Sequence, residues 1–325
     1  MAQKYDPQII ADQRCGRKAE EHLLQQSKAE GERPDAKNLR CVTHRELHSF
    51  LEEHYDRYNR PDFIPSDPIS IPHRFSKKQD IEISGFLAAT IAWGQRPTIL
   101  RNAGELMRKM DNAPHDFILN HTKTDLAQFK NFKHRTFNGV DCTFFLKSLQ
   151  NIYKKNHSLE DAFYPPPGGG QRGRTPVRSS ITNFRKIFFS IPHPHRTQKH
   201  VSSPPPTPSS GGHHSACKRI NMFLRWMVRQ DKRGVDFGIW GCFPPLKGAD
   251  TAPVGSAGGC LQPSQLMCPL DIHSGNMARK LGLLTRKQND WQSVEELTSR
   301  LREFDPKDPV KYDFALFGLG VFGKI

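Results

Sequence analysis

The stretch CKRINMFLRWMVR at residues 217–229 decides the fold, together with PLDIHSGNMARKLGL at residues 269–283. Both stretches have the apolar spacing of packed helices, which predicts helices over 217–228 and 271–283. Lys218 stands at the start of the first helix, and Asp271 stands at the start of the second. An amine and a carboxylate that are held in place can act together in nucleophilic chemistry, so we take both as candidate catalytic residues.

Each of these two residues also has a simpler interpretation. A lysine in a basic segment is commonly a solvated side chain, and Arg219 and Lys199 lie nearby in the sequence. Asp271 directly precedes an apolar helix, where aspartate is a preferred N-cap. The two interpretations of Asp271 are compatible, because a capping carboxylate is held rigidly and can still face a cleft.

The chain as a whole has the pattern of an all-α protein, since alternating runs typical of strands are scarce. Thr43 and Glu46 form a capping-box pattern at the start of one helix. Before it, residues 1–37 are a polar tail that we expect to be poorly ordered, apart from a solvated helix within 17–29. Further helices are predicted over 43–58, 80–93, 98–110, 125–129, 140–154, 159–163, 181–190, 291–304 and 309–317.

These helices form one predicted domain over 38–325, with two helical lobes and a central cleft in which Lys218 and Asp271 meet. Lobe one covers about 83–230, and lobe two joins about 43–82 to 271–325. The prolines within 62–78 indicate an extended loop. Compositional breaks predict irregular linkers or insertions at 164–180, 193–214 and 231–265.

The charge balance limits the class of partner. The 325 residues contain 48 Lys and Arg against 33 Asp and Glu, a formal charge of +15, which favours a polyanion such as nucleic acid. A basic protein without such a partner is the plainer alternative. No apolar run reaches the roughly 20 residues that span a bilayer, and no signal core follows the N-terminus, so we expect a cytoplasmic protein.

No sequence pattern indicates a metal or a cofactor. The seven cysteines include no C-x-x-C pair, and H-E-x-x-H is missing, so we expect reduced thiols and no metal cluster. A P-loop and a Rossmann glycine pattern are also missing, because Gly318-x-Gly320 has no strand before it.

Seven residues are candidate contacts to nucleic acid. Gln95 and Arg96 follow a predicted buried helix, where they could enter a groove or a gap in a base stack; a plain helix end is the alternative. Arg279 and Lys280 belong to a basic run that either touches phosphate or forms a solvated face. The set is completed by Trp93, Phe137 and His273.

Together these residues resemble the helix-hairpin-helix DNA glycosylase superfamily, which includes endonuclease III. The family's catalytic aspartate matches Asp271, and its nucleophilic lysine matches Lys218. The stretch GFLAATIAWGQR at 85–96 is similar to the family's early helix. The chain departs from the family in its hairpin, where Gly211 and Gly212 are displaced upstream, and in lacking iron–sulfur cysteines. The archaeal oxidised-guanine glycosylases show similar departures.

Residues 43–325 resemble more closely an uncharacterised bacterial family with a domain of unknown function. The matching stretches are YNRPDFI at 58–64, IPHRF at 71–75, HRTFNG at 134–139 and DPKDPVKYD at 305–313. The glycosylase resemblance implies a nucleoid-associated repair protein that binds damaged duplex DNA, with DNA glycosylase and AP lyase activity. A non-catalytic helical nucleic-acid-binding protein and a protein-interaction scaffold are the alternatives.

Overall fold

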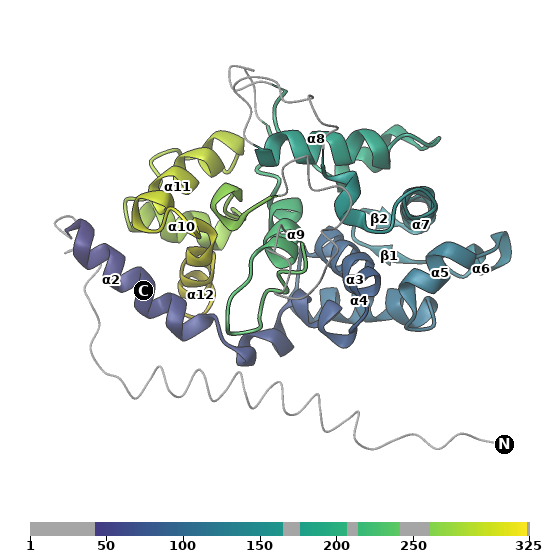
Figure 1. Cartoon of the computed structure of the whole chain (residues 1–325), viewed down its shortest axis with the longest axis horizontal. Coiled ribbons are helices and arrows are strands. Elements are labelled where there is room, and N and C mark those ends of the chain that lie inside the picture. The colour runs from purple at the N-terminus through teal and green to yellow at the C-terminus, as the bar shows by residue number, and fades with distance from the viewer. Residues whose placement is uncertain (1–42, 165–175, 207–213, 241–260, 324–325) are drawn as a thin grey trace, which may run out of the picture.

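Helices make up nearly all of the regular secondary structure in the described residues (Figure 1). The computed structural model describes residues 43–164, 176–206, 214–240 and 261–323, so the polar tail of 1–37 and its predicted helix lie outside these ranges. Within them the only strands are β1 (Lys133–His134) and β2 (Phe137–Asn138), which pair as a short antiparallel hairpin. The all-α prediction is therefore confirmed.

One group of helices contains both ends of the described chain. It consists of α2 (His44–Tyr58), α10 (Ile272–Lys280), α11 (Trp291–Phe304) and α12 (Tyr312–Phe322). Helix α2 begins where the sequence predicts, because Thr43 and Glu46 form a complete capping box. Helix α12 packs along α2 and α10, so segments far apart in the sequence lie side by side (Figure 1).

Two glycines bring α12 close to its neighbours. A Cβ atom added at Gly318 would lie 2.3 Å from the ring of Tyr58 in α2. A Cβ atom added at Gly320 would lie 2.7 Å from the carbonyl oxygen of His273 in α10. Both distances are far below carbon contact distances. The Gly318-x-Gly320 pattern therefore serves helix packing, and it holds the start of α10 against α12.

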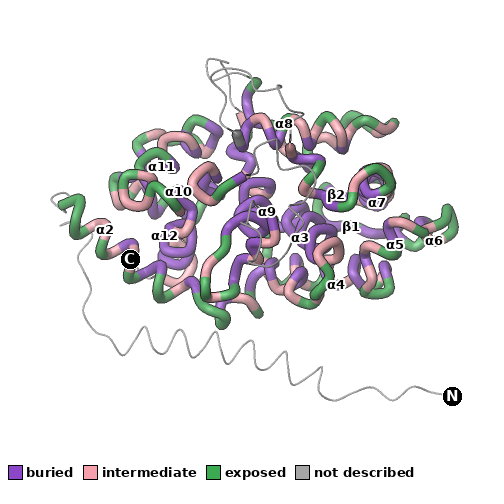
Figure 2. The backbone as a smooth tube through the Cα atoms, viewed as in Figure 1, coloured by how far each residue is buried: buried purple, intermediate pink, exposed green. Residues whose placement is uncertain are grey.

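The second group of helices is built around α3 (Lys78–Ile91), which is buried from Ile81 to Ile91 (Figure 2). Its Phe86 ring lies 5.8, 5.3 and 5.6 Å from the ring centroids of Phe145, Phe184 and Phe223. These contacts form an aromatic core. The other members of the group are α4 (Arg96–Lys109), α5 (Pro114–Asn120), α6 (Lys123–Ala127), α7 (Gly139–Tyr153) and α8 (Pro176–Phe188).

Helix α9 (Lys218–Val228) lies between the two groups and is buried from Ile220 to Val228 (Figures 1 and 2). It packs against α3 on one side. On the other side, Arg225 forms buried ion pairs with Asp236 and with Asp313 of α12. Apolar packing and buried charge thus tie α9 to both groups.

Arg229 extends this buried ion cluster directly after α9. Its guanidinium lies 3.0 Å from Asp236 and 2.9 Å from Asp308, and it donates a 2.9 Å hydrogen bond to the hydroxyl of Tyr55 in α2. A buried charge is tolerated when it is paired in this way. The cluster therefore fixes the end of α9 to the first group.

The proline-rich segment after α2 differs from the predicted extended loop. Its prolines begin three short 3₁₀ helices, η2 (Pro61–Ser66), η3 (Pro68–Ser70) and η4 (Pro72–Arg74). Proline suits the first position of a helix because its φ angle is already fixed there. The segment is packed into the core through Phe63, Ile69 and Ile71.

The predicted linkers also contain ordered structure. Helix α8 begins at Pro176, inside the predicted linker 164–180, and η6 (His195–His200) lies within 193–214. In the predicted insertion 231–265, Trp240 is fully buried and its Nε1 donates a 2.7 Å hydrogen bond to Glu82. Val235 and Trp240 are therefore part of the core, and Phe237 and Ile239 pack against it, since apolar and aromatic side chains bury a large area.

Candidate active site

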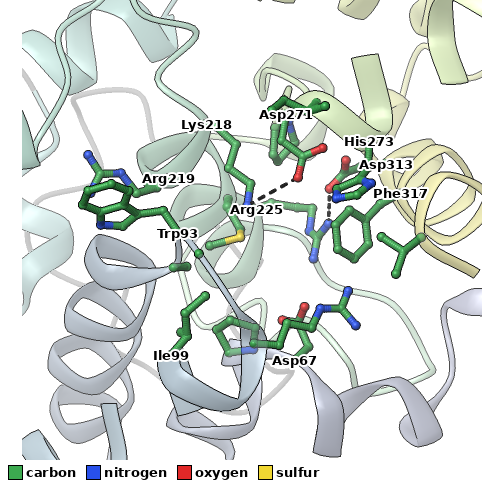
Figure 3. A pocket seen from close by; sticks show the side chains of 18 of the residues that line it. Asp67, Trp93, Ile99, Lys218, Arg219, Arg225, Asp271, His273, Asp313 and Phe317 are labelled. Atoms are coloured by element: carbon green, nitrogen blue, oxygen red, sulfur yellow. Dashed lines mark hydrogen bonds and ion pairs between the residues drawn. The ribbon is translucent and has the colours of Figure 1, made fainter. Parts of the chain in front are cut away.

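A cavity of about 640 Å³ opens where α9, α10, α12 and the start of α4 meet (Figure 3). This volume lies in the range of small-molecule binding pockets. Apolar side chains such as Ile99, Met222 and Phe317 line it together with charged ones. Both predicted catalytic residues, Lys218 and Asp271, are in its wall.

Lys218 is the first residue of α9, as the sequence predicts. The preceding Cys217 has a φ of +52°, a left-handed conformation that is unusual for a residue other than glycine. Its amide donates a 3.1 Å hydrogen bond to the hydroxyl of Ser215, and Ser215 forms a β-bridge with Asp290 just before α11. These contacts link the start of α9 to the first helix group.

Asp271 is the N-cap of α10. Its Oδ1 accepts a 2.9 Å hydrogen bond from the amide of Ser274, and the Ser274 hydroxyl accepts a 3.0 Å bond from the Asp271 amide. Asn289 also donates a 2.9 Å hydrogen bond to the Asp271 carbonyl oxygen. The carboxylate is therefore held in one orientation, which leaves its Oδ2 facing the cavity (Figure 3).

The two predicted catalytic side chains face one another across the mouth of the cavity. The Nζ atom of Lys218 lies 3.7 Å from Oδ2 of Asp271, and the side chains are 27% and 20% exposed. Neighbouring Arg219 instead donates hydrogen bonds to the carbonyl oxygens of Thr90 and Lys199. The amine and the carboxylate are thus close enough to interact while both remain accessible to a bound molecule.

Two more carboxyl groups line the cavity at greater depth. Burial raises the pKa of Asp313 to about 7, and the charge of Asp271 acts in the same direction, whereas the Arg225 guanidinium opposes it. Burial also raises the pKa of Asp67, and the positive charge of Arg96 opposes that rise. The cavity therefore combines titratable and permanently charged groups in a partly desolvated space.

The predicted turn at the end of α3 contributes to the cavity. Trp93 and Arg96 are in its wall, and the Arg135 guanidinium lies 4.6 Å from the Trp93 ring centroid. Gly94 has a φ of +112°, which allows the chain to turn into α4. Gln95 precedes α4 with an exposed side chain.

Of the remaining predicted contacts to nucleic acid, two side chains are exposed and two have structural contacts within the protein. His273 lines the cavity and is exposed, and Lys280 is exposed at the end of α10. Arg279 bonds to the carbonyl oxygen of Arg286 and to the side chain of Asn289 at 2.8 and 2.7 Å, so its contacts are structural. Phe137 is 0% exposed and packs in the aromatic core, which removes it from the candidate base contacts.

Three buried charged residues of the cavity wall were not found by sequence reasoning: Asp67, Arg225 and Asp313. Each lies in an otherwise apolar or proline-rich segment, and this is the one signal that the sequence contains. A charge among apolar residues indicates burial with a partner. Its partner depends on tertiary contacts, however, and no local spacing predicts them.

The described ranges bear on two further features, membrane-spanning helices and metal-binding groups. None of their helices combines the length and the apolar character that crossing a membrane requires. No group of three or more His, Cys, Asp or Glu side chains there is arranged to hold a metal ion. Gly211 and Gly212, where the glycosylase resemblance predicts a phosphate-binding hairpin, lie outside the described residues.

The sequence comparisons support one family. A family model described as protein of unknown function DUF2400 matches residues 67–247 and 258–322. The matched ranges contain both Lys218 and Asp271, as well as the cavity residues Asp67, Arg96 and Asp313. No curated protein and no solved structure matches the chain. Because the family model covers most of its length, this chain belongs to the DUF2400 family of proteins of unknown function.

Proposed function

We propose that this protein is a DNA glycosylase with AP lyase activity, in which Lys218 is the nucleophile and Asp271 assists it. The observation that carries the proposal is the 3.7 Å separation of Lys218 Nζ and Asp271 Oδ2 at the mouth of a cavity of about 640 Å³. The finer interpretation of the fold, a helix-hairpin-helix glycosylase-like arrangement, is part of the same proposal.

The substrate would be a nucleotide of damaged duplex DNA that leaves the base stack. Enzymes that act on a base extrude it into a pocket, because its reactive atoms are inaccessible within the duplex. The cavity provides room for a base between Trp93 on one side and Phe317 on the other (Figure 3). The formal charge of +15 favours attraction to the phosphate backbone.

The chemistry requires a neutral amine and a leaving base. The Lys218 ammonium loses a proton, and Asp271 is the nearest carboxylate that can accept it. The amine nitrogen then bonds to C1′ of the sugar, while the glycosidic C1′–N bond breaks. Its electron pair leaves with the base, which takes up the proton that Asp271 had accepted and so restores the ionised carboxylate. Asp271 stabilises the positive charge that develops on the sugar.

Strand cleavage follows from the covalent intermediate. The C1′–O4′ bond opens as the nitrogen proton moves to O4′, which leaves a Schiff base between Lys218 and C1′. Removal of a proton from C2′ then expels the 3′ phosphate. Every group in this sequence belongs to the protein or the DNA, so the mechanism uses no metal and no cofactor.

Borohydride trapping tests the proposal, because hydride adds to C1′ of the Schiff base and makes the protein–DNA bond permanent. We expect the wild-type protein to trap on duplexes with an abasic site and with at least one base lesion. Lys218→Gln abolishes trapping. Lys232→Gln is the matched control, because Lys232 is exposed and lies outside the cavity wall.

The alternatives predict different results. A non-catalytic nucleic-acid-binding protein binds DNA with strong salt dependence but never traps, and Lys218→Gln leaves its binding unchanged. A protein-interaction scaffold shows neither trapping nor a salt-dependent DNA affinity. Failure of the wild-type protein to trap on the abasic duplex and on a panel of lesions overturns the enzymatic proposal.

A further inference from the structure

The wall of the cavity opposite the Lys218–Asp271 pair also carries polar groups. Asp67 lies on that side, across the open space from Lys218 and Asp271 (Figure 3). Arg96 lines the same cavity. Neither residue has a part in the covalent steps described above, so their presence in the wall calls for a separate explanation.

The carboxylate of Asp67 has one oxygen in a hydrogen bond and, within the described structure, one oxygen without a donor. It is 6% exposed, and its Oδ1 accepts a 3.0 Å hydrogen bond from the amide of Ile69 at the start of η3. No donor from the described part of the chain bonds to its Oδ2. Burial raises the pKa of this carboxyl group, and the positive charge of Arg96 opposes the rise. Asp67 therefore presents a fixed and unused hydrogen-bond acceptor at the cavity.

Arg96 presents donors at the same wall. Its guanidinium lies 4.9 Å from the ring centroid of Phe317 and 5.4 Å from that of Phe322. Its Nη2 atom is buried and has no hydrogen-bond partner among the described residues. A buried donor without an acceptor is unfavourable, so this nitrogen would be stabilised by an acceptor supplied by a ligand.

We propose that Asp67 and Arg96 recognise the polar edge of the extruded base and select bases with adjacent N–H and C=O groups. This inference rests on the proposed function, since it identifies the substrate class of the same cavity. The N–H group of such a lactam edge donates to Asp67. The neighbouring carbonyl oxygen accepts from Arg96.

The selectivity follows from hydrogen-bond chemistry. Arginine only donates, and an ionised aspartate only accepts. Guanine, hypoxanthine, thymine and uracil present a lactam edge, with a donor beside an acceptor. Adenine presents an amino donor beside an unprotonated ring nitrogen, so in the orientation that a lactam base adopts, donors face donors and acceptors face acceptors. A site built on hydrogen bonds rejects a ligand that leaves its buried groups unpaired.

A matched pair of nucleosides tests the inference without any covalent chemistry. Deoxyinosine and deoxyadenosine share a purine ring and differ at the edge that Asp67 and Arg96 would read. Ligand-observed NMR titrations of the wild-type protein measure both affinities. We expect deoxyinosine to bind at least about tenfold more tightly, as for one well-formed pair of hydrogen bonds.

Two variants test whether Asp67 causes the preference for deoxyinosine over deoxyadenosine. Asp67→Asn keeps an oxygen that can cap η3 but adds an N–H donor, so the preference for deoxyinosine falls about tenfold or is lost. Asp62→Asn is the matched control, because Asp62 is exposed in the preceding η2 and lies outside the cavity wall. It keeps the wild-type preference. Circular dichroism establishes that each variant is folded.

The outcomes separate this inference from the proposed function. Equal binding of the two nucleosides, tighter binding of deoxyadenosine, or no detectable binding of either overturns the inference, whatever the trapping assay shows. A preference for deoxyinosine that Asp67→Asn leaves intact also overturns it. Failure of the wild-type protein to trap on an abasic duplex, which contains no base to recognise, overturns the proposed function while the nucleoside preference stands.

Discussion

The Nζ atom of Lys218 lies 3.7 Å from Oδ2 of Asp271, while the other oxygen of the same carboxylate caps helix α10. One side chain therefore combines a structural role with a proposed catalytic one. The two roles use different oxygen atoms, so substitutions can separate them.

Asp271→Asn and Asp271→Ala should differ in stability and agree in activity. Asparagine can still accept the hydrogen bond from the Ser274 amide, so Asp271→Asn keeps a wild-type free energy of unfolding. Asp271→Ala loses the cap and about 1 kcal/mol. Both variants remove the charge beside Lys218, and we expect the trapping rate to fall about 10²-fold or more. Urea unfolding and single-turnover trapping measure the two effects. A normal trapping rate in Asp271→Asn would show that the carboxylate is only a cap.

Asp313 should make the protein less stable as the pH rises. Burial raises its folded-state pKa to about 7 from an ordinary value of 3.8. The folded state then holds a proton that the unfolded state has released, so the contribution present below pH 3.8 is lost between about 3.8 and 7. The slope from this group is at most about 1.4 kcal/mol per pH unit. Urea unfolding at several pH values should show a shallower dependence in Asp313→Asn than in the wild-type protein.

Asp290 provides the control of opposite sign for that experiment. Hydrogen bonds from Arg286 lower its pKa below 3.8. Its stabilising contribution is therefore present above pH 3.8 and is lost as the pH falls through the folded-state value. Asp290→Asn should leave the slope between pH 4 and 7 unchanged. A slope that is the same in Asp313→Asn and in the wild-type protein would contradict the assignment to Asp313.

Glu82→Gln should destabilise the fold strongly. The Glu82 carboxyl group is 0% exposed and accepts hydrogen bonds from Tyr153, Ser158, Trp240 and the amide of Leu159. A glutamine amide would direct N–H groups at these donors and leave some of them unpaired. Because each unpaired buried group costs about 1–3 kcal/mol, we expect a loss of about 2–5 kcal/mol in the free energy of unfolding.

Exposed Glu53 in α2 is the matched control for Glu82, and Glu53→Gln should change stability by less than about 0.5 kcal/mol. Chemical denaturation of both variants gives the comparison. Equal effects of the two substitutions would mean that the hydrogen bonds to Glu82 contribute little.

Two glycine substitutions should have opposite effects. Gly318→Ala places a methyl group 2.3 Å from the Tyr58 ring, so α12 must move away from α2, at about 1–3 kcal/mol or more. At Gly104 in α4 the nearest atom is the flexible end of Arg108 at 3.4 Å, and Gly104→Ala should stabilise the helix by up to about 1 kcal/mol. Thermal unfolding distinguishes the two. A stable Gly318→Ala variant would contradict the close packing of these helices.

The sequence predicts the elements better than it predicts their contacts. Capping patterns place the starts of α2 and α10 correctly, because a cap is a local interaction. The seven-residue α5 was not predicted, since so short a segment shows little periodicity. Lys218 and Asp271 were identified from their positions at helix starts together with the flanking pattern that resembles the glycosylase superfamily. The burial of Phe137 and the ion pairs of Arg225 depend on residues distant in the sequence, and no local pattern contains that information.

The ion cluster of Arg225 and Arg229 has a mechanical consequence. It joins α9 to α12, Asp308 and Tyr55, while the aromatic core joins α9 to α3. Separating the helix groups would leave buried charges unpaired, at about 3–5 kcal/mol for each broken pair. The cavity is therefore preformed. Under the proposed function, it is the DNA duplex that must be deformed for a base to enter it. Base pairs already weakened by a mismatch or damage need the least work, so the stiffness of the protein itself would favour them.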